Sequence, residues 1–389
     1  MTKILITTTS FPTLSNTNTN KSYIGGGEFI LTEVMALLKA NYKVTVLTPL
    51  KKHLPIKENI NNLKIIRFKY PFMSCGNSYK NFTLHDNKSI KNYISICFLF
   101  LWFIFSIFKN IPKEKPDIIW ANWIQIGILS KIANLLSFKK IPVVATIRGS
   151  DLREMPNFLN MFFAKSCNTI LNPYTADMEI KEWIKKYKFK EIPVINTYKN
   201  LSLNRRKINI PVLTIIGRLN NESKVYQLKG LGKNLFVIIN EILTERTDIS
   251  VDIIGEGTQK KFYENLLKNH DKRVTFTGWL TDFSKYLERS SVVIGGAGLN
   301  GVVMDTTPNN IPLLISKNAT GIIWKHLSNC LVYDPDNLEN FKKMIFLALD
   351  NQDLMEKLAS KAKKDLAKYA LSIDNASFLW KKTFDNIIE

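Results

Sequence analysis

Short runs rich in β-branched residues alternate with helical stretches along most of this 389-residue chain. Between the strands of the first half lie predicted helices such as 29–38 and 124–136. This alternation is typical of βαβ units, in which parallel strands are connected by helices that cover the sheet. The first half is therefore predicted to be α/β. Its predicted strands are 3–9, 43–48, 64–68, 117–121, 142–147 and 169–171.

A polar, unpatterned segment at 197–209 interrupts the alternation, which then starts again. Helical runs such as 231–244 and 259–269 separate the strands of the second half. At about 150 residues per domain, the length accommodates two domains, so we expect two doubly wound domains joined by one linker. The predicted strands of the second half are 212–217, 250–255, 273–277, 291–294, 312–315 and 330–333.

Composition limits the possible functions. The four cysteines form no C-x-x-C pair and the four histidines form no H-E-x-x-H motif, so neither a disulfide scaffold nor a usual zinc site is expected. The net charge is +21, and residues 1–200 hold 28 Lys/Arg against 12 Asp/Glu. Such a charge favours an anionic partner, either nucleic acid or a membrane surface, unless it reflects only a lysine-rich composition. RNP, KH and zinc-finger signatures are absent, which disfavours nucleic acid.

Two segments could rest on a membrane. Residues 93–108 carry no charge but fall short of the ~20 apolar residues that span a bilayer, so a buried or membrane-resting helix is expected. An apolar stripe at helical spacing, surrounded by lysines, could lie on lipid headgroups or pack against the sheet. This stripe consists of Ile180, Trp183, Ile184 and Tyr187. The N-terminus lacks the apolar region of a signal peptide, which predicts a cytoplasmic protein.

A glycine-rich turn precedes the first predicted helix. Gly25, Gly26 and Gly27 would let backbone N–H groups approach a phosphate at the helix N-terminus. The spacing of a dinucleotide-binding G-x-G-x-x-G motif is absent. A plain tight turn is the alternative.

Two basic residues are predicted near the carboxyl ends of strands in the second domain, where doubly wound sheets bind ligands. Arg218 follows Gly217 at the end of a strand, and Lys229 opens the next helix. Together they could neutralise a diphosphate without a metal, Arg218 as a fork and Lys229 as a point charge. Lys224 competes for the second position, and the alternative is a pair of solvated basic residues.

Other loops after strands hold further candidates. Glu256 stands between two glycines, and Trp279 could border a nucleobase or be a half-buried core aromatic residue. Asp334 and Asp336 match a metal-binding D-x-D motif by sequence. Their pattern is that of a turn after a strand, so a metal site is not favoured there.

The order of these motifs resembles that of family 4 glycosyltransferases of the GT-B fold. In chain order they are GG-E, TIRGSD (146–151), GRL, KG, GEG, FTGWL and G-x-N-x4-D-x6-P, and they cover nearly the whole chain. The resemblance implies two Rossmann-like domains that face a central cleft, with 1–197 binding the acceptor and 210–370 the nucleotide sugar. Residues 371–389 are expected to form a helix that packs back toward the N-terminal domain.

The resemblance also implies roles for single residues. Arg218, Lys229 and Asp305 are expected to be catalytic, and Arg148 and Asp151 to bind the acceptor. The expected donor-binding residues are Gly26, Gly27, Gly217, Glu256, Trp279, Leu280, Gly298, Leu299 and Asn300.

The sequence departs from the family pattern at two positions. The family has Glu-x7-Glu ahead of a proline that matches Pro312, and these two positions are Ala297 and Asp305 here. Asp305 keeps a carboxylate for ribose hydroxyls, whereas Ala297 cannot bond a sugar, so Asn300 could take over that contact. Arg148 stands where relatives often have histidine, and its permanent charge prevents it from acting as a general base.

The function implied is that of a retaining, hexosyltransferase-like enzyme that moves a sugar from a nucleotide diphosphate sugar to a glycan or lipid-linked acceptor. The expected setting is synthesis of lipopolysaccharide, O-antigen or capsule at the inner face of the plasma membrane, on an anionic surface. No cofactor and no metal is expected. The alternative, motivated by Ala297 and Arg148, is a lapsed enzyme that only binds nucleotide sugar or glycan.

Overall fold

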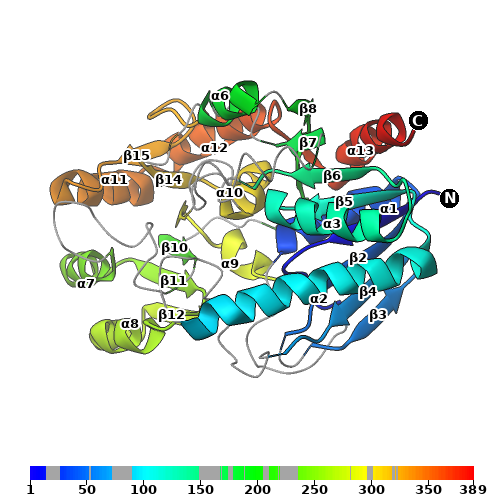
Figure 1. Ribbon diagram of the computed structural model, residues 1–389. Coiled ribbons are helices and arrows are strands. Elements are labelled where there is room, and N and C mark those ends of the chain that lie inside the picture. Colours follow the sequence, from blue (N-terminus) through cyan, green and yellow to red (C-terminus); the bar gives the residue numbers. More distant parts are fainter. Residues whose placement is uncertain are drawn as a thin grey trace. The chain divides into compact units, whose positions relative to one another are not determined.

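The described residues of this computed structural model fall into two compact units (Figure 1). Unit 1 consists of Met1–Asn18, Ile24–Thr197 and Ile373–Glu389, and unit 2 mainly of Tyr198–Ser372. The structure describes residues 1–14, 27–51, 54–71, 90–148, 167, 169–173, 178–187, 189–204, 210–217, 219, 235–280, 282–295, 301–317, 320 and 323–389.

Unit 1 is built on an eight-stranded sheet in the order β3-β4-β2-β1-β5-β6-β7-β8. Neighbouring strands run parallel, except that β3 is antiparallel to β4. The strands are β1 (Lys3–Thr7), β2 (Lys43–Pro49), β3 (Lys57–Ile60), β4 (Leu63–Phe68), β5 (Ile118–Asn122), β6 (Val143–Thr146), β7 (Thr169–Asn172) and β8 (Lys190–Pro193).

Two helices, α2 (Ile90–Glu114) and α3 (Ile124–Leu136), pack on one face of this sheet. Buried α2 side chains such as Phe103 and Ile107 join a core that includes Leu5 of β1 and Ile119 of β5. Because side chains alternate along a strand, the neighbouring residues of β1 and β5 face the opposite side.

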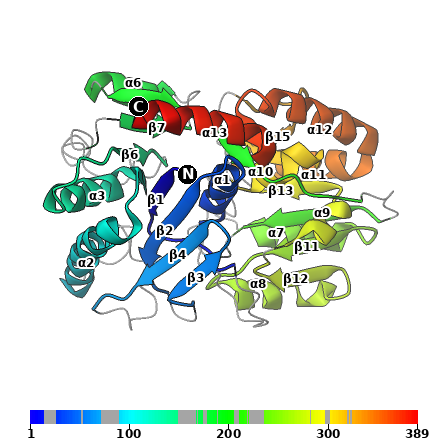
Figure 2. The same ribbon diagram turned by 90° about the vertical axis from the view of Figure 1, so that its right-hand side faces the viewer.

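On that opposite side, α13 (Ile373–Ile388) packs beside α1 (Glu28–Lys39) (Figure 2). The Trp120 ring of β5 lies 5.1 Å from the Trp380 ring of α13, and Trp380 stacks on Phe384. Tyr42 donates a hydrogen bond to Asp385 at 2.6 Å. The last helix of the chain thereby completes the core of unit 1.

Unit 2 contains a six-stranded parallel sheet in the order β12-β11-β10-β13-β14-β15. The strands are β10 (Val212–Ile216), β11 (Ser250–Ile254), β12 (Val274–Gly278), β13 (Val292–Ile294), β14 (Leu313–Ser316) and β15 (Leu331–Tyr333). A further two-stranded sheet pairs β9 (Asn196–Tyr198) with β16 (Ala370–Ser372).

Both faces of the unit 2 sheet are covered by helices. On one face, Phe236 and Phe341 from two helices pack on Leu213 and Ile215 of β10. On the other face, Leu287 and Val303 from two further helices pack against the strand side chains that point to that face. The helices are α7 (Leu235–Glu245), α8 (Lys260–Leu266), α9 (Ser284–Glu288), α10 (Gly301–Thr306), α11 (Leu338–Asp350) and α12 (Gln352–Leu366), and the 3-10 turns are η2 (Lys268–His270) and η3 (Thr307–Asn309). Helices on both sheet faces make each unit doubly wound.

The apolar segment predicted at 93–108 belongs to a longer helix than expected. α2 extends to Glu114 through Lys109 and Lys113, and its part from Ile94 onward is long and apolar enough to cross a membrane by length and composition. One side of it is nevertheless buried against the sheet.

The apolar stripe at 180–187 lies on α6 (Met178–Tyr187) and packs on the sheet of unit 1 rather than facing outward. Ile180 and Ile184 are buried with Ile170 of β7, and Trp183 stacks on Phe189 at 4.9 Å. Of the two interpretations of this stripe, packing against the sheet is the one that these contacts support; the side chain of Tyr187 lies outside the described residues.

Candidate active site

Three strand ends meet in unit 2 at glycines. The N–H of Gly217, after β10, donates to the Ile254 carbonyl at 3.0 Å, and the N–H of Gly255 donates to the Gly278 carbonyl at 2.9 Å. A Cβ on Gly255 would lie 1.8 Å from the Gly217 carbonyl oxygen, so only glycine permits this approach. Backbone groups rather than side chains therefore form this part of the carboxyl edge.

The loops that follow these strands are tied to each other. Leu219 donates to the Glu256 carbonyl at 3.0 Å, and Gln259 donates to the Leu219 carbonyl at 2.9 Å. The Glu256 carboxylate accepts a hydrogen bond from Lys260 Nζ at 2.6 Å. The same carboxylate lies close to Gly278, whose backbone has a left-handed φ of +72°. Glu256, predicted to bind the donor, is therefore a half-buried carboxylate at the edge where the glycines converge.

Trp279 and Leu280 follow β12 at the same edge. The Trp279 ring is half-buried, and its indole N–H is buried with no acceptor among the described residues. Buried indole N–H groups are usually hydrogen-bonded, so this donor suits an acceptor atom on a ligand. Leu280 packs against the apolar core on that side of the sheet.

Asp305, the predicted ribose contact, lies on α10 and is half-buried. Its carbonyl accepts from Asn309 Nδ2 at 2.8 Å, which holds the end of α10 against η3. A Cβ on Gly295, just after β13, would lie 2.9 Å from the Ile216 carbonyl oxygen. The chain that leads toward α10 therefore starts close to the end of β10.

Several predicted site residues lie outside the described residues. They are Gly26, Asp151, Arg218, Lys224, Lys229, Ala297, Gly298, Leu299 and Asn300.

In unit 1, Gly27 has the left-handed φ of +92° immediately before α1, where its carbonyl accepts from Ile30 and Leu31. A Cβ there would lie 2.6 Å from the Ser10 carbonyl oxygen. The beginning of α1 is therefore held close to the loop that follows β1.

Arg148 follows β6 and turns inward. Its guanidinium donates to both oxygens of Glu33 on α1, at 2.9 and 2.5 Å, and also to Asn122 Oδ1 at the end of β5. The Phe29 ring lies 4.8 Å from the guanidinium carbon. The Arg148 side chain is only 7% exposed, so partners within unit 1 surround the group that was predicted to bind the acceptor.

The two aspartates of the D-x-D motif are paired with a lysine side chain. Lys317 Nζ lies 2.7 Å from Asp334 and 3.8 Å from Asp336, and this lysine lowers the pKa of the Asp334 carboxyl. Asp334 also accepts from the Asp336 N–H at 2.9 Å, as in a turn. Among the described residues, no three His, Cys, Asp or Glu side chains are grouped so that they could hold a metal ion.

Two family models match the chain. "Glycosyl transferase 4-like" matches residues 25–176, and "Glycosyl transferases group 1" matches residues 210–351. A curated relative is the UDP-Gal:alpha-D-GlcNAc-diphosphoundecaprenol alpha-1,3-galactosyltransferase of Escherichia coli, 25% identical over 261 residues that cover 59% of this chain and 63% of that enzyme. The chain belongs to the family 4 glycosyltransferases.

Solved structures show that this glycosyltransferase has the GT-B fold. Sucrose-phosphate synthase from Thermosynechococcus elongatus matches with a TM-score of 0.69 and 12% identity, covering 100% of this chain and 99% of that one. Anabaena HepE in complex with UDP-glucose matches with a TM-score of 0.63 and 12% identity over 99% and 100%. Staphylococcus aureus TarM matches with a TM-score of 0.65 and 11% identity over 100% of both chains. The predicted fold class is confirmed.

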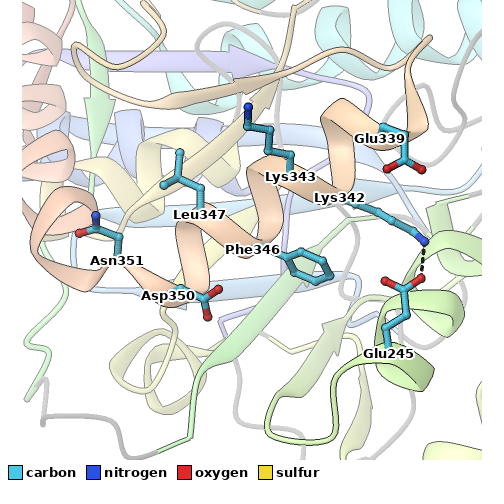
Figure 3. Close-up of a pocket in the computed structure, with 8 residues that line it drawn as sticks. All are labelled: Glu245, Glu339, Lys342, Lys343, Phe346, Leu347, Asp350 and Asn351. Atoms are coloured by element: carbon cyan, nitrogen blue, oxygen red, sulfur yellow. Dashed lines mark hydrogen bonds and ion pairs between the residues drawn. The ribbon is translucent and has the colours of Figure 1, made fainter.

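A groove of about 680 Å³ lies in unit 2 along α11, next to the end of α7 (Figure 3). Lys342 pairs with Glu245 across it at 2.5 Å, and Asp350 binds Arg246 at 2.9 Å. The groove includes none of the predicted site residues. It is lined by Glu245, Glu339, Lys342, Lys343, Phe346, Leu347, Asp350 and Asn351.

Proposed function

We propose that this glycosyltransferase moves a sugar from a nucleotide diphosphate sugar to a lipid-linked glycan, with retention of configuration at the anomeric carbon. The observation that carries the donor assignment is the junction of strand ends at Gly217, Gly255 and Gly278. Ligands of doubly wound sheets bind at the carboxyl ends of the strands, and Gly217, which is only partly buried there, has no side chain that would keep a diphosphate away.

Side chains around this junction suit the rest of the donor. The buried Trp279 N–H has no acceptor among the residues that the structure describes, and in this proposal the nucleotide provides one. The Asp305 carboxylate can accept hydrogen bonds from ribose hydroxyls. By the family motif, Arg218 and Lys229 would stabilise the charge on the departing diphosphate, each by about a few kcal/mol.

In the proposed reaction, an acceptor hydroxyl oxygen forms a bond to the anomeric carbon on the face from which the diphosphate leaves. The bond between that carbon and the diphosphate oxygen breaks, and the acceptor proton passes to the departing diphosphate. No strong protein base is required, so the permanent charge of Arg148 is compatible with transfer. The E. coli relative is an α-1,3-galactosyltransferase that uses UDP-Gal. Forming an α-glycoside from an α-configured donor is retention.

A lipid-linked acceptor is proposed because the acceptor of that relative is carried on diphosphoundecaprenol. Such an acceptor is anchored in a bilayer, so the enzyme would work at the inner face of the plasma membrane in the synthesis of lipopolysaccharide, O-antigen or capsule. The excess of basic residues in 1–200 supports attraction to an anionic surface.

The direct experiment screens a panel of nucleotide sugars by saturation-transfer NMR and then measures transfer to a short-chain diphosphopolyprenyl GlcNAc acceptor. Selective binding of one donor and formation of a disaccharide product are expected. Absence of transfer with every bound donor would contradict the proposal.

Metal-independent transfer is part of the proposal, since Arg218 and Lys229 would supply positive charge where other enzymes use a metal. Turnover in excess EDTA should equal turnover without it. Complete loss on chelation, restored by manganese or magnesium, would contradict this assignment of roles.

A second candidate function is binding without transfer, favoured by Ala297 in place of a carboxylate that would contact the donor sugar. In that case nucleotide sugars would bind and remain intact. The same NMR screen, followed over time, distinguishes the two because transfer or hydrolysis releases the nucleoside diphosphate.

A further inference from the structure

The outer side of α2 is apolar and exposed. Leu101, Phe105 and Phe108 recur at four- and three-residue spacing, and Leu101 and Phe105 are 59% and 58% exposed. The inner side of the same helix, with Phe103 and Ile107, is fully buried. A surface helix normally presents polar residues to water, so the apolar outer side of α2 up to Phe108 indicates a second apolar environment besides the core.

The exposed apolar side chains continue onto the end of α3, which contacts α2 along the same face of the sheet (Figure 2). Leu135 is 63% exposed, and Phe138, just beyond the helix, is 95% exposed with a left-handed φ of +53°. We call this set the outer apolar surface. It consists of Ile94, Leu101, Phe105, Phe108, Ile132, Leu135, Leu136 and Phe138, which are 8 of the 17 exposed large hydrophobic residues among those described.

The charges in residues 94–140, the segment that carries this surface, are mostly positive. Residues 94–140 include six lysines, at 109, 113, 115, 131, 139 and 140, and only two acids. Glu114 is paired with Lys64 at 2.5 Å, and Asp117 accepts a hydrogen bond from the backbone N–H of Lys3 at 2.7 Å. An apolar surface bordered by lysines is complementary to an anionic bilayer, whereas a second copy of the chain would bring the lysines against one another.

We propose that the outer apolar surface docks unit 1 on an anionic bilayer, with its aromatic and leucine side chains at the boundary between headgroups and acyl chains and with Lys109, Lys113, Lys139 and Lys140 at the headgroups. The proposal rests on the proposed function in one respect only: an acceptor anchored in the membrane explains why the enzyme would bind a bilayer. Because the inner side of α2 is part of the core, the helix lies along the membrane and does not span it.

The test uses the full chain with vesicles of phosphatidylcholine alone or with an equal part of phosphatidylglycerol. The wild type should sediment with the mixed vesicles. The variants Leu101→Ser/Phe105→Ser and Leu135→Ser/Phe138→Ser should each bind them at least ~10-fold more weakly, since every lost side chain removes apolar contact with lipid. Phe262→Ser on α8 of unit 2, where the side chain is also exposed, is the matched control and should bind like the wild type.

Transfer assays separate the failure of this proposal from that of the proposed function. The docking variants should retain wild-type turnover on a water-soluble acceptor and lose it selectively on an acceptor embedded in vesicles. A wild type that binds vesicles but transfers no sugar would overturn the function and leave the docking in place. Transfer without any vesicle binding would overturn the docking alone.

Three results would overturn the docking proposal directly. The serine variants could sediment as well as the wild type. The protein could be a dimer in ultracentrifugation that the same variants dissociate, which would make the surface an interface between copies. The bound protein could resist high salt and alkaline carbonate and yield only to detergent, which would indicate a spanning helix.

Discussion

Arg148 and Glu33 form a bidentate ion pair in unit 1, with Nη1 to Oε1 at 2.9 Å and Nη2 to Oε2 at 2.5 Å. The partners are 115 residues apart in sequence, and their side chains are 7% and 5% exposed. The pair joins the end of β6 to α1, and Asn122 at the end of β5 accepts from the same guanidinium. A permanently charged residue is thus accommodated where relatives often have histidine.

Removing one partner of this ion pair should lower the stability of the fold strongly, whereas replacing both partners together should lower it much less. Glu33→Ala leaves a buried guanidinium without its counter-charge and should lower the free energy of unfolding by about 3–5 kcal/mol. The double variant Glu33→Leu/Arg148→Met removes both charges and should lose much less. Urea denaturation of the single and double variants measures this, and equal losses in both would contradict the role assigned to the pair.

Arg218 and Lys229 should act on the diphosphate and not on folding. Arg218→Ala or Lys229→Ala should reduce turnover ~100-fold or more, by analogy with loss of one donor to a developing negative charge. Steady-state kinetics and thermal unfolding should be measured together, with Lys357→Ala on the exposed side of α12 as the control. Wild-type turnover in both site variants would exclude these residues and make Lys224 the next candidate.

Gly255 should not tolerate even alanine. The added Cβ would meet the Gly217 carbonyl oxygen at 1.8 Å and force the ends of β10 and β11 apart, so Gly255→Ala should lower both the melting temperature and the affinity for the nucleotide. Gly301→Ala is the control for stability, because a Cβ at Gly301 meets nothing within 4 Å. Isothermal titration and calorimetry test both points, and an unchanged Gly255→Ala variant would refute the steric account.

The attachment of α13 should weaken in acid. Hydrogen bonds from Lys381 and Tyr42 lower the pKa of Asp385, so its carboxylate stabilises the native state above the ordinary pKa of aspartate, and this contribution is lost as the pH falls. Asp385→Asn should reduce the melting temperature near pH 7 slightly, because the side chain is partly exposed. The difference from the wild type should shrink progressively as the pH falls below the ordinary pKa of aspartate. A difference that is constant with pH would contradict the linkage.

The alternation of strands and helices was sufficient to predict the two large sheets, because buried parallel strands are runs of β-branched and other apolar residues. The short sheet of β9 and β16 was not predicted. The edge strands β3 and β8 were missed. Each pairs with one neighbour only and carries exposed polar residues, as in Lys57–Ile60, so its pattern resembles a loop.

At the candidate site, too, contacts that depend on tertiary packing could not be predicted from the sequence. Glycines at strand ends are visible in the sequence, but the 1.8 Å approach at Gly255 depends on how β10 and β11 pair. The engagement of Arg148 could not be foreseen either, because Glu33 is an ordinary helix residue in sequence and becomes its partner only when the chain after β6 approaches α1. The apolar stripe of α6 and the outer side of α2 are similar in sequence pattern. Only the packing shows that the first is core and the second is surface.

The central claim is that this glycosyltransferase transfers a sugar from a nucleotide sugar with retention. The most direct measurement is proton NMR of the purified product formed from an α-configured nucleotide sugar, reading the coupling between H1 and H2 of the transferred residue. For a galactosyl or glucosyl residue, retention gives the small coupling of an α-glycoside, together with stoichiometric release of the nucleoside diphosphate. A large coupling, typical of a β-glycoside, would contradict it.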